Sequence, residues 1–337
     1  MKAIRNFGIL KAIAFITTVF FLISCDPKDE PIPVVKTTKS SVRIGIAQDV
    51  KLSSAKLTAV VVPNEDNTSV AFEYQTTNST WSTKVLPTKF SGKDSIKVTF
   101  DLSDLQLNTV YSFRLRAINV AGDTVSTIST FKTYAVSDYD GNLYHTITIG
   151  TQTWLQENLK TTHFANGDVI PNVKDATAWS NLTTPAYCYY NNDAKNGEVY
   201  GALYTWYVGH DPRGLILGWK TPGQGDYLIL RDFLGGTYSP YAVSGPKVME
   251  TGNDHWTRPA RTATNESGFT AIGNGAFGQD PVSNKFVFMN FKDCAVWWTY
   301  DEASPWGVIA EIDQANCWFS SGACHSKTLG AGLRLIK

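Results

Sequence analysis

The sequence contains few Cys, Met and His residues and has no excess of charge of either sign. Among 337 residues there are only five Cys, three Met and five His, and 30 basic residues balance 30 acidic residues. Lys2, Arg5 and Lys11 precede residue 26, so the rest of the chain carries a net charge of about −3. A chain without a basic excess has no electrostatic reason to bind nucleic acid. We therefore expect no nucleic-acid partner.

Motifs that would indicate an enzyme are also missing. The chain has no nucleophile elbow G-x-S-x-G, no H-E-x-x-H zinc motif and no phosphate loop. Cys317, Cys324 and His325 lack the spacing of strong zinc motifs. The stretch DYDGN (138–142) has its Gly at the fourth position, whereas an EF-hand loop needs it at the sixth. We expect no enzyme activity, no metal site and no cofactor.

The uncharged N-terminal run is too short to span a membrane as a stable helix. It extends from Ala12 to Ser24, which is 13 residues, whereas a spanning helix needs roughly 20. Behind positive charges, such a run is typical of a secretion signal, here residues 1–24. It ends in Leu22-Ile23-Ser24-Cys25, which resembles the lipobox of bacterial lipoproteins. The resemblance implies cleavage before Cys25 and acylation of this residue, and hence a membrane partner reached through a lipid anchor.

Residues 25–40 are predicted to be the lipidated Cys and a tether, because proline and charge keep a segment extended. Within this segment, Lys28, Asp29 and Glu30 resemble the surface-export signal of Bacteroidetes lipoproteins. The simpler interpretation is that they only keep the tether solvated. We expect an outer-membrane lipoprotein exposed at the cell surface, with the periplasmic face of the envelope as the alternative.

Residues 41–134 are predicted to form an all-β domain. Strand patterns occur at 42–46, 57–62, 70–75, 96–102, 111–118 and 125–132. In 96–102 and in 111–118, apolar and polar residues alternate, so each strand has one buried face. Seven short strands of this kind would make a two-sheet sandwich.

The stretches SVAFEYQTT and LQLNTVYSFRLRAINVAGDTVSTISTFKT resemble a bacterial fibronectin type III domain. The resemblance implies a spacer rather than a ligand-binding domain. It also implies that Tyr111 is the corner tyrosine of that family, whose hydroxyl bonds to nearby backbone.

Residues 138–337 differ in composition, since nine of the ten Trp lie there. Asp140-Gly141-Asn142 predicts a turn before a strand at 143–149. Apolar spacing predicts helices at 199–208 and 226–234, the second ended by Gly235-Gly236. Short strands are predicted at 295–299, 307–312 and 332–336. Two helices with scattered strands indicate an α+β domain.

Six ordered motifs of this region carry a second resemblance: DYDGNLYHTITIGTQTWLQENLK, NGEVYGALYTW, GWKTPGQGDYLILRDFLGG, ATNESGFTAIGNG, AVWWTYDE and GAGLRLIK. They resemble the Fibrobacter succinogenes major paralogous domain. That family looks like a divergent branch of the C-type-lectin-like fold, in which the two ends of the domain pair in one sheet. The resemblance implies that 143–149 lies beside 333–336. It implies no particular activity.

The four Cys that follow Cys25 could form disulfides in an exported protein. Cys317 and Cys324 flank a short stretch with hairpin character, and Cys188 and Cys294 would be the remaining pair. Buried free thiols are the alternative.

Aromatic residues next to amides and carboxylates indicate a possible binding surface. Flat rings of this kind suit stacking on sugars with hydrogen bonds at the ring edge. The alternative is that the rings pack under the loops. The candidate ligand-binding residues are Tyr189, Tyr190, Asn191, Asp193, Asp254 and Trp256.

We therefore expect a multidomain chain, an all-β fibronectin type III sandwich followed by an α+β C-type-lectin-like domain. The expected function is a membrane-anchored lipoprotein of the envelope or surface whose non-catalytic head binds a glycan or a protein partner. The alternatives are a structural cell-surface protein without a specific small ligand, and an enzyme that depends on Cys317 or Cys324.

Overall fold

The computed structural model of the protein describes residues 38–236, 244–257, 262–313 and 318–337. The predicted signal and most of the predicted tether lie outside the described residues. Within the described ranges, no helix is long and apolar enough to cross a bilayer.

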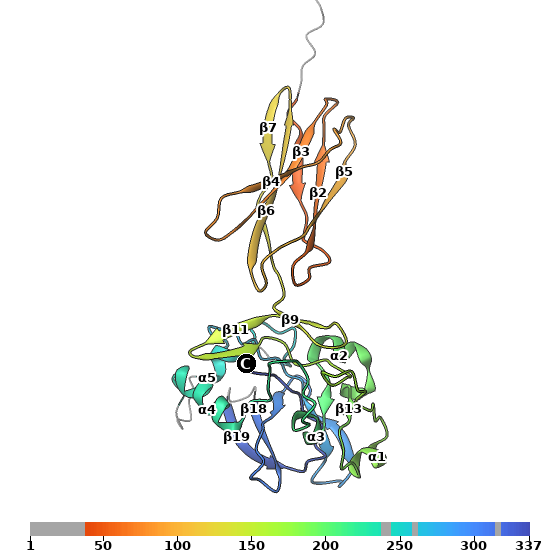
Figure 1. Cartoon of the computed structure of the whole chain (residues 1–337), viewed down its shortest axis with the longest axis vertical. Helices are drawn as coiled ribbons and strands as arrows, with labels where there is room; N and C mark the ends of the chain where they lie inside the picture. Colours follow the sequence, from red (N-terminus) through yellow and green to blue (C-terminus); the bar gives the residue numbers. More distant parts are fainter. Residues whose placement is uncertain (1–37, 237–243, 258–261, 314–317) are drawn as a thin grey trace, which may run out of the picture. The chain divides into compact units, whose positions relative to one another are not determined.

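The first domain is an antiparallel sandwich of two sheets, and Figure 1 labels its strands β2 to β7. One sheet has the order β1-β2-β5, and the other has the order β4-β3-β6-β7 with β8 also paired to β6. The predicted two-sheet sandwich is thus confirmed. Its strands are β1 (Ser41–Ile44), β2 (Ala55–Val62), β3 (Ser69–Thr76), β4 (Ser82–Val85), β5 (Ile96–Leu102), β6 (Val110–Asn119), β7 (Gly122–Val125) and β8 (Ser129–Lys132).

Alternation along the strands builds the core of this sandwich. Val98 and Leu102 of β5 share one buried cluster with Phe113 and Leu115 of β6. Burying a side chain of this size stabilises a fold by about 1.5–3 kcal/mol relative to leaving it in water. The predicted inward faces of β5 and β6 are therefore the observed ones.

Tyr111 has the bond predicted for a corner tyrosine. Its hydroxyl oxygen accepts a hydrogen bond from the backbone N–H of Gln106 at 3.0 Å. Its ring stacks on Phe131 with 5.4 Å between the centroids. The side chain therefore fixes the loop before β6 to the start of that strand.

The continuous strand predicted for 125–132 was wrong: Val125 is the last residue of β7, the strand β8 begins only at Ser129, and the two strands pair with different parts of β6. The break falls at Ser126, whose hydroxyl accepts a hydrogen bond from the N–H of Leu115. Strand β4 was not predicted, since all four of its residues are exposed and show no alternation.

The second domain contains many short elements around one larger sheet. The predicted turn at 140–142 is confirmed, since Gly141 has a φ of 81° between β9 and β10. The elements are β9 (Val136–Ser137), β10 (Leu143–Tyr144), β11 (Thr146–Ile149), β12 (Gln152–Leu155), α1 (Ala176–Ser180), β13 (Tyr187–Cys188), the 3₁₀ helix η1 (Tyr190–Asn192), α2 (Ala194–Tyr200), β14 (Leu203–Tyr204), α3 (Trp206–Gly209), α4 (Gln224–Phe233), α5 (Ser244–Val248), β15 (Ala276–Gln279), β16 (Phe286–Met289), β17 (Cys294–Trp298), β18 (Gly307–Asp313) and β19 (Trp318–His325).

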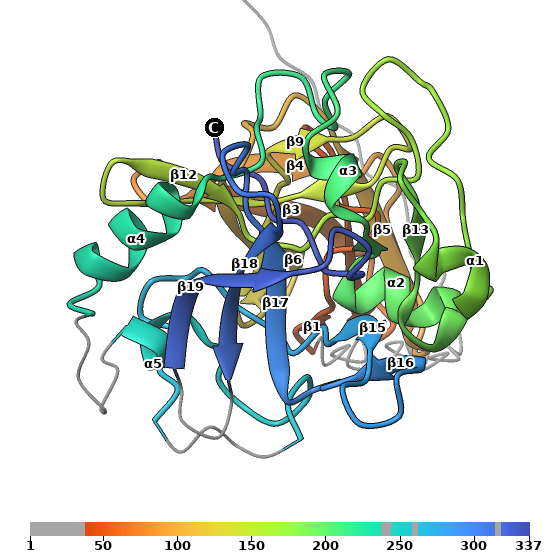
Figure 2. The same cartoon turned by 90° about the horizontal axis from the view of Figure 1, so that it is seen from below.

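Strands β17, β18 and β19 lie side by side in this order (Figure 2). Their residues belong to two separate apolar clusters. Successive residues of a strand point to opposite faces. Val296 and Ile309 accordingly lie in one cluster, and Trp297 and Ala310 in the other. Helices α4 and α5 cover the second face, and Leu230 of α4 belongs to its cluster.

The continuous helix predicted at 199–208 was wrong. Helix α2 ends at Tyr200, and α3 begins only at Trp206, with β14 between them. Gly201 breaks the helix, because its φ is 82° and a Cβ there would lie 2.7 Å from the carbonyl oxygen of Leu159. The apolar residues on the two sides of this glycine therefore belong to three separate elements, α2, β14 and α3, and not to the face of one helix.

The helix predicted at 226–234 is present as α4, which begins two residues earlier. The carboxylate of Asp226 accepts a hydrogen bond from the N–H of Gly223 at 2.8 Å, which stabilises the first turn. Gly235, with a φ of 86°, ends the helix as predicted.

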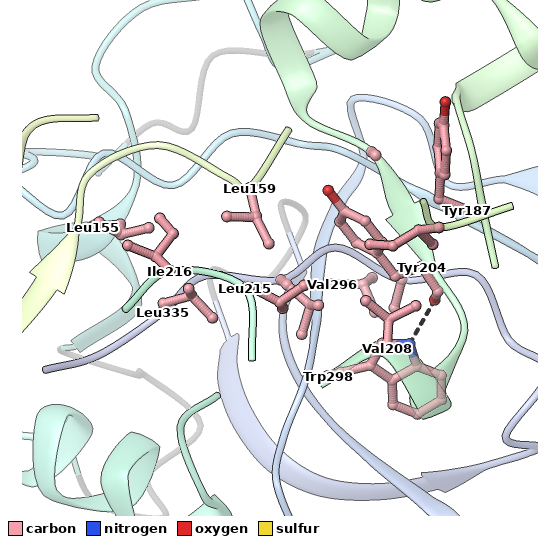
Figure 3. Packing of buried hydrophobic residues seen from close by; sticks show 14 of the residues in the cluster. Leu155, Leu159, Tyr187, Tyr204, Val208, Leu215, Ile216, Val296, Trp298 and Leu335 are labelled. Atoms are coloured by element: carbon pink, nitrogen blue, oxygen red, sulfur yellow. Dashed lines mark hydrogen bonds between the residues drawn. The ribbon is translucent and has the colours of Figure 1, made fainter. Parts of the chain in front are cut away.

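The chain end pairs with the start of the domain, one strand later than predicted. The backbone N–H of Leu155 in β12 donates to the carbonyl of Leu335 at 3.0 Å. Strand β11 pairs only with β12, so the expected contact of 143–149 with 333–336 was wrong. Figure 3 shows Leu155 and Leu335 in the buried cluster, together with the hydrogen bond from the Trp298 indole to the carbonyl of Tyr204, 2.7 Å long.

Candidate functional site

Two of the aromatic rings predicted to stack on a ligand lie inside the second domain. Tyr190 is 7% exposed and stacks on Phe291 with 4.2 Å between centroids. Trp256 is 1% exposed and belongs to the cluster beneath α4 and α5. Their faces are covered by protein, so the prediction that they bind a sugar was wrong. The alternative, that these rings pack under the loops, describes them correctly.

The other four predicted residues do not form a site with one another. Tyr189 packs edge-on to Tyr187, and the carboxylate of Asp193 accepts a hydrogen bond from the N–H of Lys195 at the start of α2. Asn191 and Asp254 are exposed. None of the six predicted residues lines either of the two cavities described below.

The thiols of Cys188, Cys294 and Cys324 are free, and Cys317 lies outside the described residues. The structure therefore lacks the predicted disulfide between Cys188 and Cys294. The two thiols belong to separate parts of the core, since Cys188 packs with Trp179 and Cys294 against a different cluster. Burial raises the pKa of both thiols, to about 12 for Cys294, where nearby carboxylates add to the effect.

The carboxylates of the DYDGN turn are used within the protein. Asp138 accepts hydrogen bonds from Asn142 and from the Tyr144 hydroxyl, the latter 2.7 Å long. Asp140 accepts from the N–H of Thr162 and from the His163 ring, each at 2.5 Å. Both carboxylates thus hold loops together. In the described part of the chain, no group of three or more His, Cys, Asp or Glu could hold a metal ion.

A pocket of about 660 Å³ opens beside the central sheet, and we call it the Trp306 pocket. Its volume lies within the roughly 300–1,000 Å³ typical of small-molecule sites. It is lined by residues of β15, β16, β17, β18 and β19 and of the adjoining loops: Ser180, Ala276, Gly278, Gln279, Pro281, Phe286, Met289, Asn290, Val296, Trp306, Ile309, Glu311, Cys324, His325, Ser326, Thr328 and Leu329.

The lining of the Trp306 pocket combines an apolar floor with polar groups. Buried side chains such as Val296, Ile309 and Leu329 lie at its base. Trp306 is 58% exposed, so a ring face is open to a ligand, in contrast to Tyr190 and the other buried aromatics. Amides, hydroxyls and one carboxylate complete the wall. This combination suits a ligand with both flat apolar faces and polar edges.

His325 adds a neutral imidazole to the same pocket. Neighbouring protein atoms lower the pKa of its ring by desolvation, and the nearby carboxylate of Glu311 partly opposes this effect. A His with a lowered pKa is uncharged at neutral pH. It can then both donate and accept a hydrogen bond to a ligand hydroxyl.

A smaller cavity of about 250 Å³ lies between Trp219, Lys220 and Tyr300, among other residues. Tyr300 is the outer ring of a stack in which His210 lies 4.5 Å from Tyr300 and 3.5 Å from Trp206. This cavity is smaller and offers fewer polar groups than the Trp306 pocket. We therefore take the Trp306 pocket as the candidate site.

The sequence offered only weak signals for this pocket. Trp306 follows Ser304-Pro305 in a turn outside the six recognised motifs. Glu311 and His325 come together in the pocket because β18 pairs with β19. They are too far apart in the sequence for a local motif to predict this contact. Cys25 and the predicted export signal at 28–30 lie outside the described residues.

Comparison with protein families gives one match for this domain. A family model described as the Fibrobacter succinogenes major domain matches residues 147–336, more than half of the chain. The match covers every residue that lines the Trp306 pocket. The comparison with curated proteins gives no match.

Several solved structures resemble part of the chain. The sensor domain of the anti-sigma factor RsgI4 from Pseudobacteroides cellulosolvens is 22% identical, with 29% of this chain and 92% of that chain covered and a TM-score of 0.24. A fibronectin type III domain of human fibronectin type III domain containing protein 3 is 19% identical, with coverages of 32% and 96% and a TM-score of 0.23. A fibronectin type III domain from human KIAA0970 protein is 16% identical, with coverages of 30% and 79% and a TM-score of 0.22.

Proposed function

The chain belongs to the Fibrobacter succinogenes major domain family, and we propose that its second domain is a non-catalytic head that binds a glycan through the Trp306 pocket. The observation that carries this proposal is an exposed tryptophan at the edge of a 660 Å³ pocket with polar walls. Aromatic faces stack on the apolar faces of sugar rings, and the surrounding amides and hydroxyls bond to the ring edges.

The shape of the pocket favours a chain of sugars over a single ring. Trp306 directly precedes β18, and Glu311 lies five residues further along the chain, which corresponds to at most roughly 16 Å of extended strand. Both residues line the same pocket, so its length exceeds that of one sugar. A protein partner with an exposed loop is the alternative occupant.

We further propose that this domain is a distant member of the C-type-lectin-like fold. The pairing of the chain end with β12 supports this, because the two ends of a lectin-like domain meet in one sheet. A further feature in support is strand β17, in which the consecutive Trp297 and Trp298 are both fully buried.

Binding is tested with the full chain and two matched variants. An array of oligosaccharides is probed with the wild-type protein, with Trp306→Ala and with Phe233→Ala, which removes a ring of similar exposure on α4 outside the pocket. We expect the wild-type protein to bind a defined set of glycans. Trp306→Ala should bind these glycans about tenfold or more weakly, which corresponds to about 1.4 kcal/mol, and Phe233→Ala should bind them with wild-type affinity. Equal binding by all three proteins would contradict the proposal by placing the binding site outside the pocket, and no binding by any would favour a purely structural surface protein.

The lipid anchor and the surface location are proposals that rest on the N-terminal sequence. A tag is placed after Lys337, and intact cells are treated with protease and compared with cells producing Cys25→Ser. We expect the wild-type protein to incorporate a labelled fatty acid, to remain with the membrane and to lose its tag, while Cys25→Ser incorporates no label. A tag that survives until the outer membrane is opened would place the domain in the periplasm. Peptidoglycan would then be the first glycan to test.

A further inference from the structure

Among the described residues that line the Trp306 pocket, there is one carboxylate and no Lys or Arg. The carboxylate is that of Glu311, which is partly buried in the middle of β18. The carboxylate of Glu311 accepts a hydrogen bond from the Ser320 hydroxyl at 3.3 Å. Within the described ranges, Glu311 takes part in no ion pair. A partly buried carboxylate without a cation is costly unless something else compensates its charge.

Other acidic groups lie near the same end of the sheet. After burial, the next causes that raise the pKa of the Cys294 thiol are the carboxylates of Asp313, Glu311 and Asp293. The cation closest along the chain to the pocket residues 324–326 and 328 is Lys327, and its ammonium lies over the Trp206 ring at 3.8 Å from the centroid. The described residues that line the pocket therefore supply no Lys or Arg to pair with the carboxylate of Glu311.

We propose that the pocket takes an oligosaccharide of amine-bearing sugars, with one ring against Trp306 and the ammonium of another sugar of the same chain against the carboxylate of Glu311. This inference rests on the proposed glycan-binding function and names the class of sugar. An ammonium paired with a carboxylate makes a charge-assisted hydrogen bond, which is about twice as strong as a neutral one. A uronic acid would bring a second carboxylate into a pocket without a cation, so like-charge repulsion disfavours it.

Three probes of equal length compare positively charged, neutral and negatively charged sugars. They are a tetramer of glucosamine, a tetramer of N-acetylglucosamine and a tetramer of galacturonic acid. Affinities of the full chain are measured by calorimetry below pH 7, where the glucosamine amines are protonated. We expect the glucosamine tetramer to bind about tenfold more tightly than the acetylated one, equivalent to about 1.4 kcal/mol, and the galacturonic acid tetramer to bind least.

Glu311→Gln removes the charge and keeps the shape, and Glu198→Gln removes an exposed charge on α2 outside the pocket. We expect Glu311→Gln to weaken the glucosamine tetramer about tenfold and the acetylated tetramer less than about twofold, so that the preference disappears. Glu198→Gln should leave both affinities unchanged. An equal loss in the two variants would show general attraction of a polycation and would overturn the inference.

The failure of this inference can be told apart from failure of the proposed function. If the acetylated or acidic tetramer binds best and loses affinity in Trp306→Ala, the pocket binds glycans but the assigned sugar class is wrong. If no tetramer binds and the wider array also shows no Trp306-dependent glycan, both proposals are wrong.

Discussion

Arg334 donates two hydrogen bonds to a single oxygen, Oδ1 of Asn158, in the centre of the second domain. The distances are 3.1 Å from Nε and 2.7 Å from Nη2, and a third bond runs from Nη1 to the carbonyl of Phe269 at 2.6 Å. Asn158 also accepts from the Trp297 indole and donates to the carbonyl of Tyr200. One fully buried Arg and one Asn thereby join the chain end to three distant segments.

This pair predicts a large loss of stability when the guanidinium is removed. Arg334 has 0% exposure, and burial lowers its pKa to about 10, so it stays charged at neutral pH. We expect Arg334→Met to lower the free energy of unfolding by about 3 kcal/mol, because all four hydrogen bonds from a charged donor are lost, including a long one of 3.5 Å to the carbonyl of Thr270. Arg334→Lys should not restore stability, since an ammonium cannot reproduce the planar fork.

Denaturant unfolding followed by Trp fluorescence measures this loss in the full chain, as nine of the ten Trp lie in the second domain. The double variant with Asn158→Ala should cost less than the sum of the single variants, because both remove the same bonds. Full additivity would contradict a direct coupling between the two side chains.

Much of the fold could be predicted from local sequence patterns. The alternation in β5 and β6 identifies their buried faces because each strand has water on one side. The role of Tyr111 was predicted from the resemblance to a fibronectin type III domain, and its hydroxyl bonds to a residue only five positions away. The helix predicted at 199–208 failed because Gly201 needs a positive φ, and an apolar spacing of three and four does not reveal a break in the backbone.

The candidate site could not be predicted, because its residues come together only through long-range pairing. Glu311 faces the pocket as a consequence of the register of β18 with β17 and β19. Tyr190 and Trp256 were chosen since their sequence neighbours are polar, yet both rings point inward. A polar neighbourhood along the chain does not decide on which side of a loop an aromatic ring packs.

The corner bond of Tyr111 predicts a local loss of stability in the sandwich. In Tyr111→Phe the ring still packs on Phe131, but the N–H of Gln106 loses its acceptor. We expect a cost of about 1 kcal/mol, typical of one buried hydrogen bond. Hydrogen exchange measured by mass spectrometry should show faster exchange in peptides covering Gln106, with unchanged exchange in peptides of the second domain. Unchanged exchange at Gln106 would contradict this role of the hydroxyl.

The three described thiols should react in a fixed order. Cys324 is exposed, Cys294 is partly buried, and Cys188 is fully buried with its pKa raised by burial. Since only the thiolate reacts, alkylation of the native, unreduced protein should modify Cys324 first, Cys294 much more slowly and Cys188 only after unfolding. Peptide mass spectrometry identifies each site separately. An unreactive Cys324 that becomes reactive after reduction would show that it forms a disulfide instead.

His210 predicts a specific loss of stability in acid. Its Nε2 accepts a hydrogen bond from the N–H of Asp301 at 3.2 Å, while its Nδ1 lies 3.0 Å from the carbonyl of Trp206. The Trp206 bond requires a proton on Nδ1, so a second proton on Nε2 would face the donor of Asp301. Desolvation between the stacked rings lowers the pKa of His210 to about 4, compared with 6.5 for the free side chain.

Because the pKa is lower in the folded protein, the unfolded chain takes up the proton first as the pH falls. The contribution of His210 is fully present above pH 6.5, declines between pH 6.5 and about 4, and stays constant below that range. We expect the wild type to lose about 1–2 kcal/mol more than His210→Gln between pH 7 and pH 4.5, since partial contact with water reduces the full effect. Unfolding of both proteins is followed by Trp fluorescence at matched ionic strength, so that the titration of carboxylates cancels in the comparison. Parallel stability profiles for the two proteins would contradict a neutral, buried His210.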